Sequence, residues 1–302
     1  MNDTLTPRDP EELEANATAT TGEISPRTTL GAVHLTVADL ERSLAYYHSA
    51  IGLETIEAGA GRATLGAGGH ELLVLVEEPG ARPAPGSTGL YHFALLVPAR
   101  VELARWLAHA IRDRVPLTGL SDHFVSEALY LNDPDGHGIE IYADRPRHVW
   151  EGQVRQRMTT LPVDVQGLLG ELADPATEPF GGLPAGTTMG HVHFKVADVA
   201  ATVGFYRDTL GFGLMAQLGA QAAFLSAGGY HHHIGANTWE SVGGAPAPPG
   251  SAALRYATVV LPDTAELDRV TERLEAHGVR VDESSGGRLV RDPSRNVLLL
   301  RT

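Results

Sequence analysis

The sequence contains no cysteine among its 302 residues, and this absence removes three kinds of chemistry. Without cysteine the chain can form no disulfide, offer no thiolate to a metal and carry no cysteine nucleophile. Any metal site must therefore be built from histidine, aspartate and glutamate side chains.

Positive charge is also scarce. The 23 lysines and arginines stand against 37 aspartates and glutamates, which gives a net charge of -14, and Lys195 is the single lysine. Such a chain lacks the basic surface that binds nucleic acid or an anionic membrane by displacing counterions. We therefore expect neither nucleic acid nor a membrane as a partner.

Long apolar runs are missing as well. No stretch approaches the roughly 18 apolar residues of a membrane-spanning helix. Residues 1–28 are polar and acidic, without the charged start and apolar segment of a secretion signal. These features predict a disordered tail over residues 1–28 and a cytoplasmic protein.

The sequence does contain a repeat. One strand, one helix and several short strands recur four times with a period of roughly 55–65 residues, and such a period marks a repeated structural unit. The copies begin near Gly31, Gly89, Gly190 and Ala253. This order predicts an α+β fold with two domains, each made of two consecutive copies, over residues 29–147 and 189–302. Residues 148–188 then form a linker, with a short helix expected over residues 163–172.

One carboxylate stands out against this pattern. Glu140 lies between Ile139 and Ile141 in an apolar strand that follows the turn Asp133-Pro134-Asp135-Gly136. A carboxylate buried in such a strand is costly unless a cation or a metal balances it. Glu140 is therefore a candidate metal ligand.

Two strand histidines are its natural partners. His34 and His92 occupy equivalent places in the first two copies, so pairing of these copies would bring both imidazoles close to Glu140. Two imidazoles and one carboxylate form the facial triad of non-haem Fe(II) oxygenases, although Mn(II), Zn(II), Ni(II) and Co(II) accept the same ligands. In the second half His92 is replaced by Tyr256 and Glu140 by Leu299, so the fold itself does not require the triad.

The second half carries a separate group of histidines. Five of them fall within one copy of the repeat: His191, His193, His231, His232 and His233. They could form a second metal site or serve a polar structural role. The missing carboxylate and the positive charge of Lys195, which shares a strand face with His193, argue for the polar role.

The stretch around Glu140 also carries an extended motif. His123 is followed after five residues by Leu129-Tyr130, then by the acidic turn at Asp133 and by Glu140. This arrangement resembles the signature of the ring-cleaving extradiol, or catechol 2,3-dioxygenase-like, branch of the vicinal oxygen chelate (glyoxalase/bleomycin resistance/dioxygenase) superfamily. Ser121 departs from the small or β-branched residue that the family places two positions before the histidine.

The resemblance implies a fold and a chemistry. The family is built from paired βαβββ modules, and the order of modules fits residues 30–302. By resemblance, Fe(II) would bind at His34, His92 and Glu140, and a catechol- or hydroquinone-like substrate and dioxygen would meet there. His123 and Tyr130 would be the catalytic groups that contact the substrate oxygens and the bound oxygen. The family's two-domain enzymes hold iron in the C-terminal half, whereas these residues lie in the N-terminal half.

Two other functions on this fold remain open. A glyoxalase-like isomerase or lyase would need a fourth ligand, for which only Glu71 or Glu77 is available. A binding protein of the antibiotic-sequestering kind would need no chemistry, and the class generally lacks the His, His, Glu set. The sequence does not decide whether the chain forms a homo-oligomer.

Overall fold

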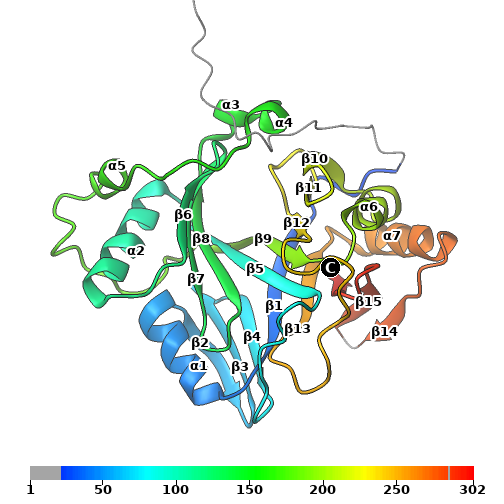
Figure 1. Ribbon diagram of the computed structural model, residues 1–302, viewed down its shortest axis with the longest axis horizontal. Helices are drawn as coiled ribbons and strands as arrows, with labels where there is room; N and C mark the ends of the chain where they lie inside the picture. The colour runs from blue at the N-terminus through cyan, green and yellow to red at the C-terminus, as the bar shows by residue number, and fades with distance from the viewer. Residues whose placement is uncertain (1–21, 285) are drawn as a thin grey trace, which may run out of the picture.

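The computed structural model describes residues 22–284 and 286–302, and these form sixteen strands in two eight-stranded sheets (Figure 1). The predicted α+β fold with four modules paired into two units is confirmed. Each module begins with a strand that leads into a helix, and its remaining strands return antiparallel to one another.

The first sheet combines the first and fourth modules in the order β14-β15-β16-β13-β1-β4-β3-β2. The first module contains β1 (Thr29–Val37), α1 (Leu40–Tyr46), the π-helical turn η1 (Tyr47–Ile51), β2 (Glu54–Gly59), β3 (Arg62–Ala67) and β4 (His70–Glu77). The fourth contains β13 (Leu254–Val260), α7 (Thr264–Ala276), β14 (Asp282–Ser284), β15 (Gly287–Arg291) and β16 (Val297–Arg301).

The second sheet combines the second and third modules in the order β10-β11-β12-β9-β5-β8-β7-β6. The second module contains β5 (Gly89–Leu96), α2 (Arg100–Asp113), β6 (Gly119–Asp122), β7 (Ser126–Asn132) and β8 (Gly138–Asp144). The third contains β9 (Thr188–Lys195), α6 (Val199–Val203), the π-helical turn η2 (Gly204–Thr209), β10 (Gly213–Leu218), β11 (Ala222–Ser226) and β12 (Ile234–Asn237).

Consecutive modules therefore lie in different sheets, so the first two copies do not pair with each other. The central contacts are antiparallel pairs between modules from opposite halves, β1 with β13 and β5 with β9. The short connections between modules run alongside each other, with bridges from Arg82 to Ser251 and from Thr88 to Pro246, and each carries the chain from one sheet to the other. Residues 29–147 and 189–302 thus each contribute one module to each sheet.

Alternation along the central strands of the second sheet separates its two faces. Phe93 and Leu95 on β5, and Val192 and Phe194 on β9, are buried in the hydrophobic core. Successive side chains of a strand point to opposite faces. The intervening residues, His92 among them, therefore face away from this core, and they can carry polar groups without disturbing it.

The linker covers one end of the second sheet. It contains α3 (Arg147–Trp150), α4 (Val154–Arg157) and α5 (Val165–Leu169), of which α5 lies inside the helix predicted for residues 163–172. Trp150, Val154 and Met158 pack with Phe224 of β11 in a small hydrophobic cluster. The linker is thus part of the wall around this face. None of the helices in the described ranges is long and apolar enough to cross a membrane.

The described part of the predicted tail is attached to the fold. Residues 1–21 lie outside the described residues, but Ile24 is 2% exposed, and its backbone N–H donates to the Gly211 carbonyl oxygen at 2.9 Å. The Ser25 N–H donates to Glu266 Oε1 at 2.7 Å. These contacts correct the prediction of disorder for residues 22–28, because a single buried isoleucine in a polar stretch gives too weak a sequence signal.

We expect Ile24→Ala to lower the free energy of unfolding by about 2–5 kcal/mol, the usual cost of truncating a fully buried aliphatic side chain. Urea denaturation followed by circular dichroism measures the change. Ile56→Ala is the control, since Ile56 is 40% exposed and a surface change of this kind costs about 0.5 kcal/mol or less. Equal effects of the two variants would contradict the anchoring role of Ile24.

Candidate active site

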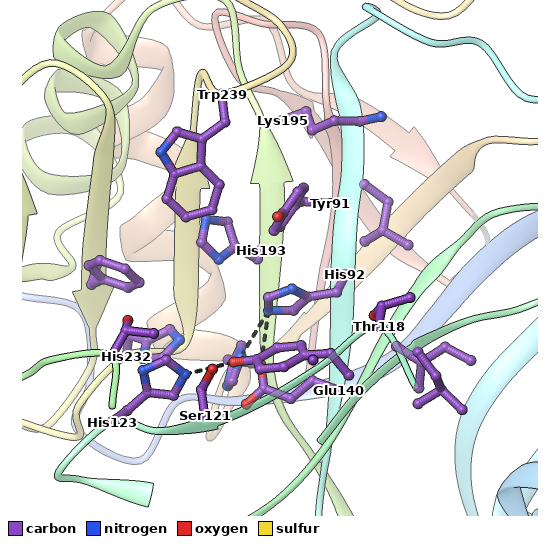
Figure 2. A pocket seen from close by; sticks show the side chains of 18 of the residues that line it. Tyr91, His92, Thr118, Ser121, His123, Glu140, His193, Lys195, His232 and Trp239 are labelled. Carbon is purple, nitrogen blue, oxygen red and sulfur yellow. Dashed lines mark hydrogen bonds and ion pairs between the residues drawn. The ribbon is translucent and has the colours of Figure 1, made fainter. Parts of the chain in front are cut away.

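Three buried side chains converge on one point of the second sheet. His92 comes from β5 and Glu140 from β8, and Figure 2 shows both side chains. His191 comes from β9. Glu140 Oε2 lies 3.1 Å from His92 Nε2 and 3.0 Å from His191 Nε2, and the two Nε2 atoms are 3.3 Å apart. We call these three residues the triad.

The electrostatics of the triad keep Glu140 charged. Burial raises the pKa of Glu140, but the neighbouring His191 and His92 outweigh this effect and hold that pKa well below its usual value. Burial lowers the pKa of His191, against the opposing pull of the Glu140 carboxylate. The triad therefore combines an ionised carboxylate with a histidine whose protonated form is disfavoured by burial.

The triad fits a divalent metal. Its two imidazole nitrogens and one carboxylate oxygen form the only group of metal-ligating atoms found among residues 22–284 and 286–302. Two imidazoles with one carboxylate are a recognised ligand set for divalent first-row metals. A bound cation would also balance the buried charge of Glu140, which otherwise carries a large desolvation cost.

The structure does not bring His34 to this group, which corrects the prediction that His34 is a ligand. His34 lies on β1 in the first sheet, where its ring stacks on Tyr256 with centroids 3.9 Å apart. Burial, followed by the charges of Arg62, Arg255 and Arg301, lowers the pKa of His34 to about 4. His34 and His92 lie in different sheets because their modules do not pair.

The two predicted catalytic residues lie beside the triad. His123 Nδ1 donates to the Thr159 carbonyl oxygen at 2.7 Å, so the neutral ring presents Nε2 as an acceptor to the Tyr130 hydroxyl at 2.8 Å. Burial and then the Glu140 carboxylate raise the pKa of Tyr130 well above its usual value. Tyr130 therefore keeps its hydroxyl proton and can donate a hydrogen bond between His123 and Glu140.

A further histidine reaches the same space through a chain of hydrogen bonds. The Asp144 carboxylate accepts from His231 Nε2 at 2.9 Å, and His231 Nδ1 lies 2.8 Å from His232 Nδ1. If Nε2 of His231 carries its proton, its Nδ1 must accept, so His232 Nδ1 donates and His232 Nε2 keeps a free lone pair. His232 lines the same pocket as the triad. These hydrogen bonds thus determine that Nε2 is the nitrogen of His232 that can act as an acceptor.

The pocket itself is a cavity of about 660 Å³. It is lined by His92, Glu140 and His191, by His123 and Tyr130, and by His193, His232, Tyr91, Phe224 and Trp239 among others. Three histidines of the third module, His191, His193 and His232, therefore share one pocket with the residues of the second. Within the described ranges they do not form a separate metal site in the C-terminal half.

His191 and His232 belong to this site, although the sequence pattern did not assign them to it. Their signal was the concentration of histidines in the third module, which suits a module that faces the one carrying Glu140. This concentration of histidines could not be assigned to the Glu140 site without knowing which modules pair.

Comparison with known proteins assigns the chain to a family. The family model described as "Glyoxalase/Bleomycin resistance protein/Dioxygenase superfamily" matches twice, over residues 29–141 and 188–299. These two ranges cover most of the chain, and each contains two of the modules described above.

A curated relative shares much of the sequence. The catechol-2,3-dioxygenase of Bacillus subtilis (strain 168) is 44% identical over 272 residues, covering 88% of this chain and 94% of the relative. Among solved structures, a Bacillus subtilis protein with a provisional dioxygenase assignment matches with a TM-score of 0.65 and 15% identity, covering 92% of this chain and 86% of its own. Glyoxalase I from Zea mays matches with a TM-score of 0.53 and 15% identity, covering 90% and 92%. At such identities the two structures show a shared fold.

Proposed function

Because the chain belongs to the glyoxalase/bleomycin resistance protein/dioxygenase superfamily, we propose that its pocket binds Fe(II) and cleaves a catechol- or hydroquinone-like ring with dioxygen. Similarity to the Bacillus subtilis catechol-2,3-dioxygenase over most of both chains makes the protein an enzyme of the extradiol dioxygenase type. The observation that carries the proposal for the metal is the triad, in which three ligand atoms lie within 3.3 Å of one another.

The residues that would hold the metal are His92, Glu140 and His191. Non-haem Fe(II) oxygenases use this ligand set, and Mn(II), Zn(II), Ni(II) and Co(II) can also occupy it. When bound, Fe(II) would supply the Lewis acidity and the redox chemistry that let a catechol react with dioxygen. The overall reaction adds both oxygen atoms of dioxygen to the two carbons of the ring bond that breaks, and it needs no other oxidant.

The remaining residues of the pocket would handle protons. His232 Nε2 can accept a hydrogen bond or a proton from a substrate hydroxyl as the catechol binds. The Tyr130 hydroxyl can donate a hydrogen bond to an oxyanion that develops during the reaction, and it can take a proton from the substrate while passing its own to the lone pair of His123 Nε2. The linker residue Met158 and Phe224 line the pocket and exclude water from part of it.

The test is turnover by the loaded enzyme. Protein loaded with Fe(II) under argon and then mixed with catechols and oxygenated buffer should consume one dioxygen per ring and form a yellow ring-opened product. Glu140→Ala should show neither. No oxygen uptake across a broad panel of catechols and hydroquinones by fully loaded protein would overturn the proposal.

The same preparation tests the two alternatives. A glyoxalase-like enzyme would isomerise a hemithioacetal of glutathione without consuming oxygen, and the Zea mays glyoxalase I structure shares the fold with this chain. A binding protein would retain an aromatic or antibiotic ligand without changing it. The triad favours the dioxygenase, since within the described residues only three ligands come together.

Asp144→Ala is expected to lower kcat by about 100-fold, the lower end of what a positioned proton-transfer group contributes. Without the Asp144 carboxylate, His231 no longer holds the proton of His232 on Nδ1, so Nε2 loses its fixed role as acceptor. Steady-state oxygen uptake gives kcat, and elemental analysis must show unchanged iron. Asp208→Ala is a matched control, since the exposed Asp208 carboxylate pairs with the half-buried Arg207. Equal kcat values for the Asp144 variant and wild type would exclude the proposed role of the hydrogen bonds that link Asp144, His231 and His232.

A further inference from the structure

A row of polar side chains runs along β9 from the triad to the opposite end of the pocket. His191, His193 and Lys195 all line the pocket, while Val192 and Phe194 between them are buried in the core. Alternate residues of a strand lie roughly 6.6 Å apart. In Figure 2, Lys195 and Trp239 lie at the end away from Glu140, with His193 and Tyr91 between them.

The ammonium group at the end of this row is weakly engaged. The Lys195 side chain is 18% exposed, and its Nζ lies 3.7 Å from Glu240 Oε2, whose side chain is 59% exposed. A long ion pair with a solvated partner contributes little stability. The single lysine of this acidic chain therefore stands at a substrate pocket with its charge available to a ligand.

The space between the triad and Lys195 suits an aromatic ring. The rings of Tyr91, His193 and Trp239 contact one another pairwise, with centroids 5.3 to 5.8 Å apart. His193 Nε2 is buried and has no hydrogen-bond partner among the described residues. That unused ring nitrogen can form a hydrogen bond with a substrate.

We propose that the pocket is built for a catechol that carries a short acidic side chain, and that Lys195 binds the carboxylate of that side chain. This inference rests on the proposed dioxygenase function. Four steps along the strand place the Cα atoms of His191 and Lys195 roughly 13 Å apart, and the flexible lysine stem shortens the remaining gap. A catechol ring held at the triad, with a carboxylate attached through one to three carbon atoms, spans this distance. Unsubstituted catechol cannot reach Lys195, whose ammonium group then keeps only its ion pair with Glu240.

The first test compares binding of 3,4-dihydroxyphenylacetate with binding of its neutral methyl ester. Calorimetry under argon on Fe(II)-loaded protein gives both dissociation constants without turnover. Wild type should prefer the acid, and Lys195→Met should reduce this preference by about 10- to 100-fold, the range for a hydrogen bond to a charged group. Lys195→Arg should retain most of the preference, and Glu240→Gln should increase it by removing the competing carboxylate.

Arg280→Met is the matched control for loss of one positive charge. Arg280 is 85% exposed and pairs with Asp282 of the first sheet, so its removal should leave the preference unchanged. An equal drop of the preference for the acid in Lys195→Met and Arg280→Met would indicate a general charge effect and would overturn the role of Lys195. Equal binding of acid and ester by wild type would also overturn it, while leaving the dioxygenase proposal intact. Failure of both ligands to bind loaded protein would defeat both proposals.

A second readout uses the fact that Lys195 carries the only side-chain amine. Brief acetylation followed by peptide mass spectrometry reports its accessibility directly. The acid should protect Lys195 and the ester should not, and this difference does not depend on activity. Protection by both ligands alike would mean that the ring alone covers the lysine, and the proposed contact with the carboxylate would then be wrong.

Discussion

His191→Ala is expected to abolish metal binding and ring cleavage together. His191 supplies one of three ligand atoms, and its Nε2 lies 3.0 Å from Glu140 Oε2. Changes in the groups that merely support metal ligands cost about 10- to 100-fold in affinity, so loss of a ligand should cost more than about 100-fold. Elemental analysis after anaerobic loading and gel filtration measures the metal, and oxygen uptake measures the activity.

Two other histidine variants sharpen this result. His34→Ala should keep its metal, because His34 stacks on Tyr256 in the first sheet. His193→Ala should also keep it, although His193 lies on the same strand face as His191, because His193 Nε2 does not approach Glu140 as His191 does. Metal lost from the His34 variant and retained by the His191 variant would reverse the assignment of the third ligand.

The third ligand shows how far the sequence could lead. The sequence locates the modules and His92 through local alternation of apolar and polar residues. It locates the other site residues through one compact motif that contains His123, Tyr130 and Glu140. Which modules pair is a long-range property. All four central strands bury one apolar face, so hydrophobic pattern alone permits the pairing of consecutive modules as readily as the observed one.

Even with the correct pairing of modules, equivalent positions in the repeat would have pointed to the wrong histidine as the third ligand. His193 is the counterpart of His34, and the register places His193 opposite His92 as it places His34 opposite Tyr256. The residue that joins His92 and Glu140 is nevertheless His191, whose counterpart in the first module is Ala32. The two sheets therefore share a backbone plan but differ in which position of the central strand carries the polar group. Leu299, in the place of Glu140, completes that difference.

Tyr130→Phe is expected to lower kcat by about 10²- to 10⁴-fold, the range for removal of a positioned proton-transfer group. The substitution keeps the ring and removes only the hydroxyl, which donates to His123 Nε2 at 2.8 Å. Iron content should stay at the wild-type level, since Tyr130 supplies no ligand. Tyr91→Phe removes a hydroxyl from the same pocket and should have a much smaller effect on kcat.

His123→Ala combined with Tyr130→Phe separates catalysis from packing. If the two residues pass one proton along a single path, the first substitution already blocks that path, so the double variant should be no slower than the slower single variant. Groups that act as a unit behave in this non-additive way. Multiplied losses in the double variant would show that Tyr130 and His123 act independently, and loss of iron from either single variant would show that the pair supports the triad instead of moving a proton.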